Sequence, residues 1–131
     1  MAHDMHLTKA SDSVSFSRPD VRTSPSWKSA GTHVTERRPS DVYSVFMLYD
    51  RGRHLDIECA TSACDVPTVT DTDEHVLARV GPRFLLPFAG ARAPFSGLVN
   101  WRQNGRYASG ELERQADLLY FTAEVDPPHG W

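Results

Sequence analysis

The densest run of hydrophobic positions lies in residues 42–59, VYSVFMLYDRGRHLDIEC. Its first part, Val42–Tyr49, is almost wholly apolar and rich in β-branched and aromatic residues, which favours a strand. Asp50-Arg51-Gly52-Arg53 follows, with the polar, glycine-containing composition of a turn. Residues 54–59 then alternate between polar and apolar, as a half-buried strand does. The stretch Val42–Cys59 therefore predicts a β-hairpin.

Two turns are compatible with this hairpin, and the choice decides which side chains face the core. A three-residue loop with Gly52 at positive φ directs one set inward: Tyr43, Val45 and Met47, with Leu55 and Ile57. A two-residue Arg51-Gly52 loop directs the other set inward: Phe46 and Leu48. The first loop is favoured because arginine disfavours positive φ. In both cases the first strand is apolar on both faces, so we expect the second face to be covered by another segment or by a partner chain.

A second hairpin is predicted around Asn104-Gly105, the pair that type I′ turns prefer. It joins strands Gly97–Gln103 and Arg106–Leu112. Pairing outward from the turn places Trp101 opposite Ala108, whose small side chain leaves room for the indole. The opposite face of the hairpin, which carries Arg102, is expected to be solvated.

One short helix is predicted between the hairpins, over roughly Thr72–Val80. Asp71 is the expected N-cap, Glu74 its reciprocal partner in a capping-box-like arrangement, and Gly81-Pro82 the end of the helix.

Two further strands are predicted in the second half of the chain. Phe84–Phe88 is apolar, but Pro87 lacks a donor N–H, which places this run on a sheet edge or in a buried loop. Residues 111–121 suit a helix or a strand. We favour a strand that continues past Glu111, an irregular turn near Gln115–Asp117, and a final strand Leu118–Val125.

Residues 1–41 are dense in Ser, Thr and Pro and show no sustained hydrophobic period, which predicts an extended or disordered N-terminal arm beside a single β-rich domain, 42–131. The alternative is an arm ordered against its own domain or a neighbouring subunit. The alternating patch Ser13–Ser17 suits addition of a strand to a sheet edge.

Together these elements predict an α+β, mainly β fold. Two hairpins and a C-terminal strand form a small antiparallel sheet or partly closed barrel, with one short helix and the arm outside. The predicted core residues are Val45, Met47, Leu55, Ile57, Val76, Leu77, Val80, Leu86, Val99, Trp101, Leu119 and Phe121.

Size and charge narrow the function classes. A chain of 131 residues favours one domain. The net charge is −3 and like charges do not cluster, which disfavours a nucleic-acid partner. No apolar stretch approaches the ~20 residues of a membrane span, and the start lacks the apolar segment of a secretory signal. We therefore expect no membrane partner and a cytoplasmic location by default.

The sharpest candidates for chemistry are His54, Asp56 and Glu58, which share one face of a predicted strand at a spacing of ~7 Å. Such a set suits acid–base work or a divalent cation, but the solvent side of an amphipathic strand explains it better. Cys59 and Cys64 form a lone C-x4-C, which is weak support for zinc, and two free thiols are expected. The sequence has no nucleophile elbow or phosphate loop, and we expect no metal or cofactor.

These patterns favour a non-enzymatic protein–protein interaction or structural subunit, with a protein partner or a homo-oligomer. It would bind through the arm and the second apolar face of Val42–Tyr49. The candidate partner-binding residues are Val14, Phe16, Trp27, Phe46, Leu48 and Trp131. The alternative is a small β-barrel that binds or transforms a small molecule, with His54, Asp56 and Glu58 in its pocket.

Overall fold

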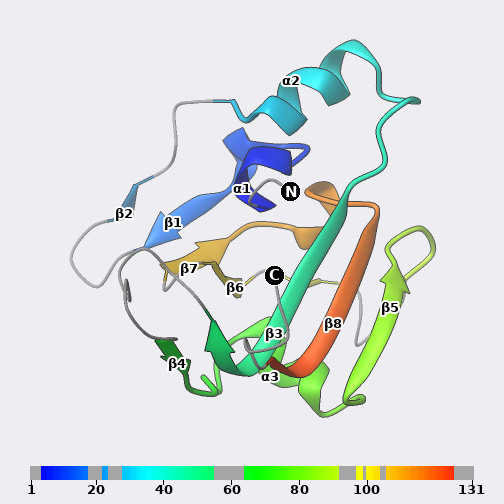
Figure 1. The fold of residues 1–131 in the computed structure, drawn as a ribbon. Helices are drawn as coiled ribbons and strands as arrows, with labels where there is room; N and C mark the ends of the chain where they lie inside the picture. Colours follow the sequence, from blue (N-terminus) through cyan, green and yellow to red (C-terminus); the bar gives the residue numbers. More distant parts are fainter. Residues whose placement is uncertain are drawn as a thin grey trace.

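The structure is a computed structural model that describes residues 4–17, 22–23, 28–54, 64–91, 97–98, 100–103 and 106–125. Two four-stranded sheets share one hydrophobic core, with helices α1 and α2 at one end of the molecule (Figure 1). The elements in chain order are α1 (Asp4–Leu7), η1 (Ser11–Ser13), β1 (Ser15–Ser17), β2 (Arg22–Thr23), α2 (Ala30–Arg37), β3 (Val45–His54), β4 (Cys64–Val66), α3 (Asp73–Ala78), β5 (Arg83–Pro87), β6 (Asn100–Gln103), β7 (Arg106–Ser109), η3 (Leu112–Arg114) and β8 (Leu118–Val125). The mixed α and β content agrees with the predicted class.

The first sheet has the strand order β4-β3-β8-β5 and is mixed rather than antiparallel. β3 and β8 lie side by side and parallel, with Val45 opposite Leu118 and Arg51 opposite Glu124. β5 pairs antiparallel with β8 and forms an edge of the sheet, as its Pro87 predicted. The prediction of an antiparallel sheet is wrong here, because the β3–β8 pairing joins segments about 70 residues apart and no turn signal marks it. The sheet is open, not a closed barrel.

The predicted turn at residues 50–53 is wrong, because β3 runs unbroken from Val45 to His54. Gly52 serves a different purpose within the strand. Its φ is 129°, and a Cβ atom there would lie 1.9 Å from the carbonyl oxygen of Val125. Only glycine permits this close approach of the two backbones. β3 does pair antiparallel with β4. The residues that connect the two strands, 55–63, lie outside the described residues, and so does the predicted second strand after His54.

The inward face of β3 is also opposite to the favoured prediction. Phe46 and Leu48 are only 1% and 4% exposed, whereas Tyr43 and Val45 are exposed. The prediction failed because it rested on a turn that does not exist. Of the predicted core, the structure confirms Leu77, Leu86, Trp101, Leu119 and Phe121. It contradicts Val45, Val76 and Val80, which are exposed, and Met47, which is half-buried and points away from this core. Leu55, Ile57 and Val99 lie outside the described residues.

The second sheet has the order β2-β1-β7-β6 and contains the predicted Asn-Gly hairpin. β6 and β7 pair with Gln103 opposite Arg106 and Trp101 opposite Ala108, which confirms the predicted register. Both Trp101 and Ala108 are buried in the core. β1 extends this sheet by pairing with β7, so the patch predicted to add to a sheet edge does so within its own chain.

The described part of residues 1–41 packs onto the rest of the chain instead of lying outside it. Val14 belongs to the hydrophobic core. Lys9 N donates to Gln115 O at 3.0 Å, and Lys9 Nζ donates to Asp117 Oδ1 at 2.8 Å. Asp117 Oδ2 also accepts from Ser44 N at 2.8 Å. Burial alone would raise the pKa of Asp117, but the Lys9 and Ser44 hydrogen bonds outweigh burial and lower it.

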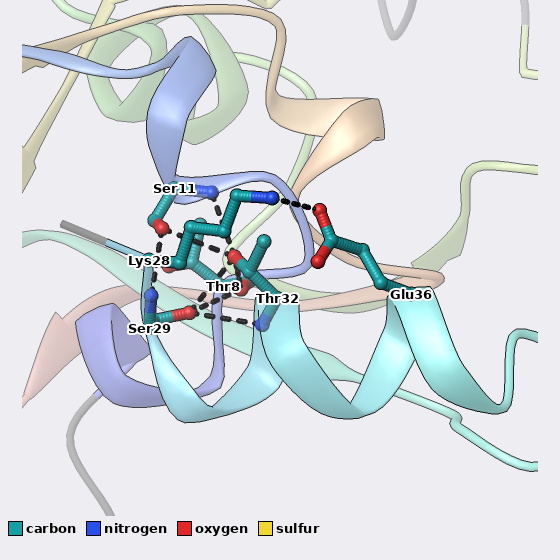
Figure 2. A network of polar contacts seen from close by, with 6 residues as sticks. All are labelled: Thr8, Ser11, Lys28, Ser29, Thr32 and Glu36. Atoms are coloured by element: carbon teal, nitrogen blue, oxygen red, sulfur yellow. Dashed lines mark hydrogen bonds and ion pairs between the residues drawn. The ribbon is translucent and has the colours of Figure 1, made fainter. Parts of the chain in front are cut away.

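Helix α2 is held by a buried network of hydroxyl groups (Figure 2). Ser29 is the N-cap, and its Oγ accepts from Thr32 N at 3.0 Å while donating to Thr8 O at 2.6 Å. Thr32 Oγ1 donates to the same Thr8 oxygen and accepts from Ser11 N, both at 2.9 Å. Ser11 Oγ in turn accepts from Ser29 N at 2.8 Å. The serines and threonines that suggested a disordered arm therefore pair with one another.

α2 approaches α1 closely at Gly31. A Cβ atom at Gly31 would lie 2.3 Å from the carbonyl oxygen of Leu7, so the contact requires glycine. An ion pair between Lys28 and Glu36 lies beside the hydroxyl network and is exposed (Figure 2). The dense polar contacts, and not an apolar stripe, fix the position of this helix.

The remaining predicted elements are confirmed in part. The final strand β8 has the predicted bounds, Leu118–Val125. Helix α3 forms where predicted, but Thr72, not Asp71, occupies its N-cap position and makes no side-chain capping hydrogen bond. The predicted capping box is absent, because the Glu74 side chain accepts from β6 instead. The strand expected to continue past Glu111 is instead the short helix η3.

Candidate functional site

The outer face of the first sheet carries a compact set of apolar side chains. Because Phe46 and Leu48 point inward, the alternate residues of β3 point outward, and the same alternation holds along β8 and β5. The strand register places these outward residues in rows across three strands. Two rows are apolar, Val45–Leu118–Pro87 and Met47–Tyr120–Leu85, and the third row, Tyr49–Thr122–Arg83, contains the buried Thr122 and ends in a charged residue. We call this set the outer face.

Two side chains show that the outer face reaches solvent. Val45 is 40% exposed and Leu85 is 62% exposed. Exposed apolar side chains that share one face of a sheet mark a candidate interaction site. The outer face is therefore the strongest candidate for binding in the described part of the chain.

Charged residues follow the apolar rows at one end of the outer face. Arg51 and Glu124 are strand partners there, and Arg51 Nη2 lies 3.2 Å from Glu124 Oε2. Arg53 and Asp65 form a further pair on β3 and β4, with 3.4 Å between Nε and Oδ1. These charges have both signs. The face therefore combines an apolar part with a polar border of mixed charge, as protein–protein interfaces do.

A second cluster, of buried polar groups, joins helix α3 to the second sheet. β6 is the last strand of that sheet, so its Asn100 and Arg102 N–H groups point to a free edge. Asp73 Oδ2 accepts from Asn100 N at 2.8 Å, and Glu74 Oε1 accepts from Arg102 N at 2.6 Å. Two carboxylates of the first helical turn thus cover the strand edge, whereas the sequence predicted Glu74 only as a partner in a capping box.

Burial determines the electrostatics of these two carboxyl groups. It raises the pKa of Asp73 to about 6 and that of Glu74 to about 7, and the backbone hydrogen bonds only partly oppose it. Glu74 is 1% exposed, and its Oε2 has no hydrogen-bond partner among the described residues. The cluster therefore costs stability when both groups are ionised.

The same cluster extends to β3 through Asp50 and Arg102. The Arg102 guanidinium donates to the carbonyl oxygens of Asp50 and Pro67, the latter at 2.6 Å, so the expectation of a solvated Arg102 is wrong. Asp50 Oδ2 accepts from Thr68 Oγ1 at 2.9 Å, and Asp50 Oδ1 lies 4.0 Å from His75 Nδ1. This arrangement orients His75 beside a buried carboxylate.

The residues that the sequence proposed as a site lie partly in the core and partly outside the described residues. His54 is the last residue of β3, but its side chain is not described. Asp56 and Glu58 lie outside the described residues. Val14, Phe46 and Leu48 were predicted to bind a partner but are buried in the chain's own core. Phe16 pairs with Ala108 through its backbone, and its side chain is not described. Trp27 and Trp131 lie outside the described residues.

The outward residues of β8 and β5 were missed. The sequence does carry a signal for them, since Leu118–Phe121 is apolar at every position and therefore on both faces of its strand. The same pattern predicted that Val42–Tyr49 is apolar on both faces.

Comparisons with known proteins give no relative. No family model matches the chain, and neither a curated protein nor a solved structure matches it. Within the described ranges, no three His, Cys, Asp or Glu side chains come together in a way that could hold a metal ion. None of the described helices is long and apolar enough to cross a membrane. Any functional assignment therefore rests on the outer face and its chemistry.

Proposed function

We propose that this chain is a non-enzymatic protein–protein interaction subunit that binds through the outer face. The observation that carries the proposal is the exposure of Val45 and Leu85 within rows of apolar residues on β3, β8 and β5. The sequence predicted this role for Phe46 and Leu48, which the core buries, so the outer face is formed instead by the alternate residues of β3. The N-terminal segment contributes by completing the second sheet and the core.

Covering this face contributes part of the free energy that specific binding requires. Full burial of an exposed valine or leucine contributes about 1.5–3 kcal/mol. Val45, Leu85 and the half-buried Leu118 and Tyr120 together therefore supply several kcal/mol. That gain offsets part of the cost of association, and the net gain of about 8 kcal/mol that micromolar affinity requires depends on further contacts at the polar border.

Site-specific photo-crosslinking in the native cell tests this proposal. A photoreactive amino acid replaces Leu85, and the control replaces Val34 on α2, a similarly exposed apolar residue (49%) on another element. We expect a discrete adduct from position 85 and none from position 34. The adduct should disappear when Tyr120→Glu places a charge in the neighbouring strand, because an uncompensated carboxylate is costly to bury at an interface.

The result that would overturn the proposal is equally specific. If position 85 yields no adduct above that of position 34, or if Tyr120→Glu leaves the adduct unchanged in a folded chain, the outer face is not a binding surface.

A further inference from the structure

The outer face has a pattern of charge that complements itself. β3 and β8 are its two central strands and run parallel, so their outward residues form matched pairs at the same height: Val45 with Leu118, Met47 with Tyr120, Tyr49 with Thr122, and Arg51 with Glu124. Each pair has one residue on β3 and one on β8. The charged pair has opposite signs, and the apolar pairs occupy the opposite end.

A twofold axis parallel to the strands, placed over the outer face midway between β3 and β8, would bring these pairs of two copies together. Rotation about such an axis stacks β3 of one copy on β8 of the other and keeps every row at its own height. Arg51 then faces Glu124 of the second copy, and Glu124 faces its Arg51. The two apolar rows meet the same rows of the second copy. The two sheets would stack about 10 Å apart with the ~30° crossing that sheet twist produces.

We propose that the occupant of the outer face is a second copy of this chain, packed face to face about that axis. The inference rests on the proposed function and adds the identity of the partner. A twofold interface requires a surface that is complementary to itself. Charges of one sign at the border would have pointed to a partner of opposite charge. The border instead presents Arg51 beside Glu124, which satisfies the symmetry condition.

Charge reversal on the full-length chain tests the geometry. Arg51→Glu puts two carboxylates on each copy, and Glu124→Arg puts two guanidinium groups on each copy. In a dimer of either variant with itself, like charges face each other across the axis at two places. In a mixed dimer, each carboxylate faces a guanidinium. We expect each variant alone to dissociate about tenfold or more readily than the wild type, and an equimolar mixture to regain wild-type association.

Sedimentation equilibrium measures these states, and the chain supplies a matched control. Arg51 and Glu124 have side chains that are 54% and 64% exposed, while Arg114 and Glu111 form an ion pair away from the outer face with exposures of 56% and 59%. Arg114→Glu should leave association unchanged. Should a single reversal fail to fold, the double swap Arg51→Glu with Glu124→Arg restores both charge pairs and should dimerise like the wild type.

Two outcomes would overturn this inference. One is a wild-type chain that stays monomeric at millimolar concentration. The other is a wild-type dimer that Arg51→Glu and Glu124→Arg leave intact, or whose loss in each variant is not repaired by mixing them. A monomeric chain that still forms the position 85 adduct with another protein overturns the self-association alone, whereas absence of any such adduct overturns the proposed function as well.

Discussion

The buried carboxyl group of Glu74 should make the stability of this protein fall as the pH rises from about 4.5 to above 7. Its Oε1 accepts from Arg102 N, while its Oε2 lies buried without a partner among the described residues. Burial raises its pKa from 4.5 to about 7. A raised pKa means that the native state binds the proton more tightly than the unfolded state. The stabilisation is complete when the pH is below the pKa that Glu74 has in the unfolded chain. It is lost as the pH rises past the pKa that Glu74 has in the native state.

The size of the effect follows from the shift in pKa. Each unit corresponds to about 1.4 kcal/mol, so a rise from 4.5 to about 7 corresponds to a loss on the order of 3 kcal/mol between acid and alkaline pH. Glu74→Gln removes the ionisation but keeps a carbonyl oxygen that can accept from Arg102 N. The difference in unfolding free energy between wild type and variant isolates Glu74, because the other titrating groups are common to both.

Urea denaturation at several pH values from 4.5 to 8.5 provides the assay, with the slope against urea compared to verify two-state unfolding. We expect wild type to lose about 3 kcal/mol relative to Glu74→Gln over this range. A difference that stays constant within about 0.5 kcal/mol, or that grows in the opposite direction, would refute the burial of an ionisable Glu74 against β6.

Two further predictions concern the attachment of α2 and use the same denaturation measurement. Gly31→Ala should destabilise the chain by about 1–3 kcal/mol, because the new Cβ would collide with the carbonyl oxygen of Leu7. Gly81→Ala is the control and should be tolerated, because its Cβ would have its nearest neighbour at an ordinary 3.8 Å. Thr32→Val should lower the free energy of unfolding by about 1–3 kcal/mol, because Ser11 N and Thr8 O each lose a buried hydrogen bond to Thr32 Oγ1. Thr35→Val is the control and should leave the free energy of unfolding unchanged, since Thr35 Oγ1 has no hydrogen-bond partner in the described part of the chain. Equal losses within either pair would contradict the contacts assigned to α2.

Local signals predicted the elements whose partners lie close in sequence. Asn104-Gly105 specified both the pairing of β6 with β7 and the placement of Trp101 opposite Ala108. The proline of β5 predicted a sheet edge or a buried loop, and β5 is an edge strand. In the hairpin the residues that determine the structure are the ones that pair, whereas Pro87 acts through its own missing N–H group.

Distant contacts account for the errors. Gly52 in a polar stretch has the composition of a turn, but the backbone of Val125 requires that glycine, and no local pattern shows this approach. The error in the turn then reversed the faces of β3 and assigned Phe46 and Leu48 to a partner. Likewise, the sequence predicted Glu74 as a capping-box partner, and only the structure shows that Asp73 and Glu74 accept hydrogen bonds from β6.

The most direct test of the outer face as a self-association surface is hydroxyl-radical footprinting of the purified wild-type chain at low and high concentration. We expect labelling of Leu85 and Tyr120 to fall as the concentration rises, while labelling of Val34 and Val76, which are exposed on the helices, stays constant. Labelling of Leu85 and Tyr120 that does not change with concentration, in a chain shown to be folded, would contradict the account.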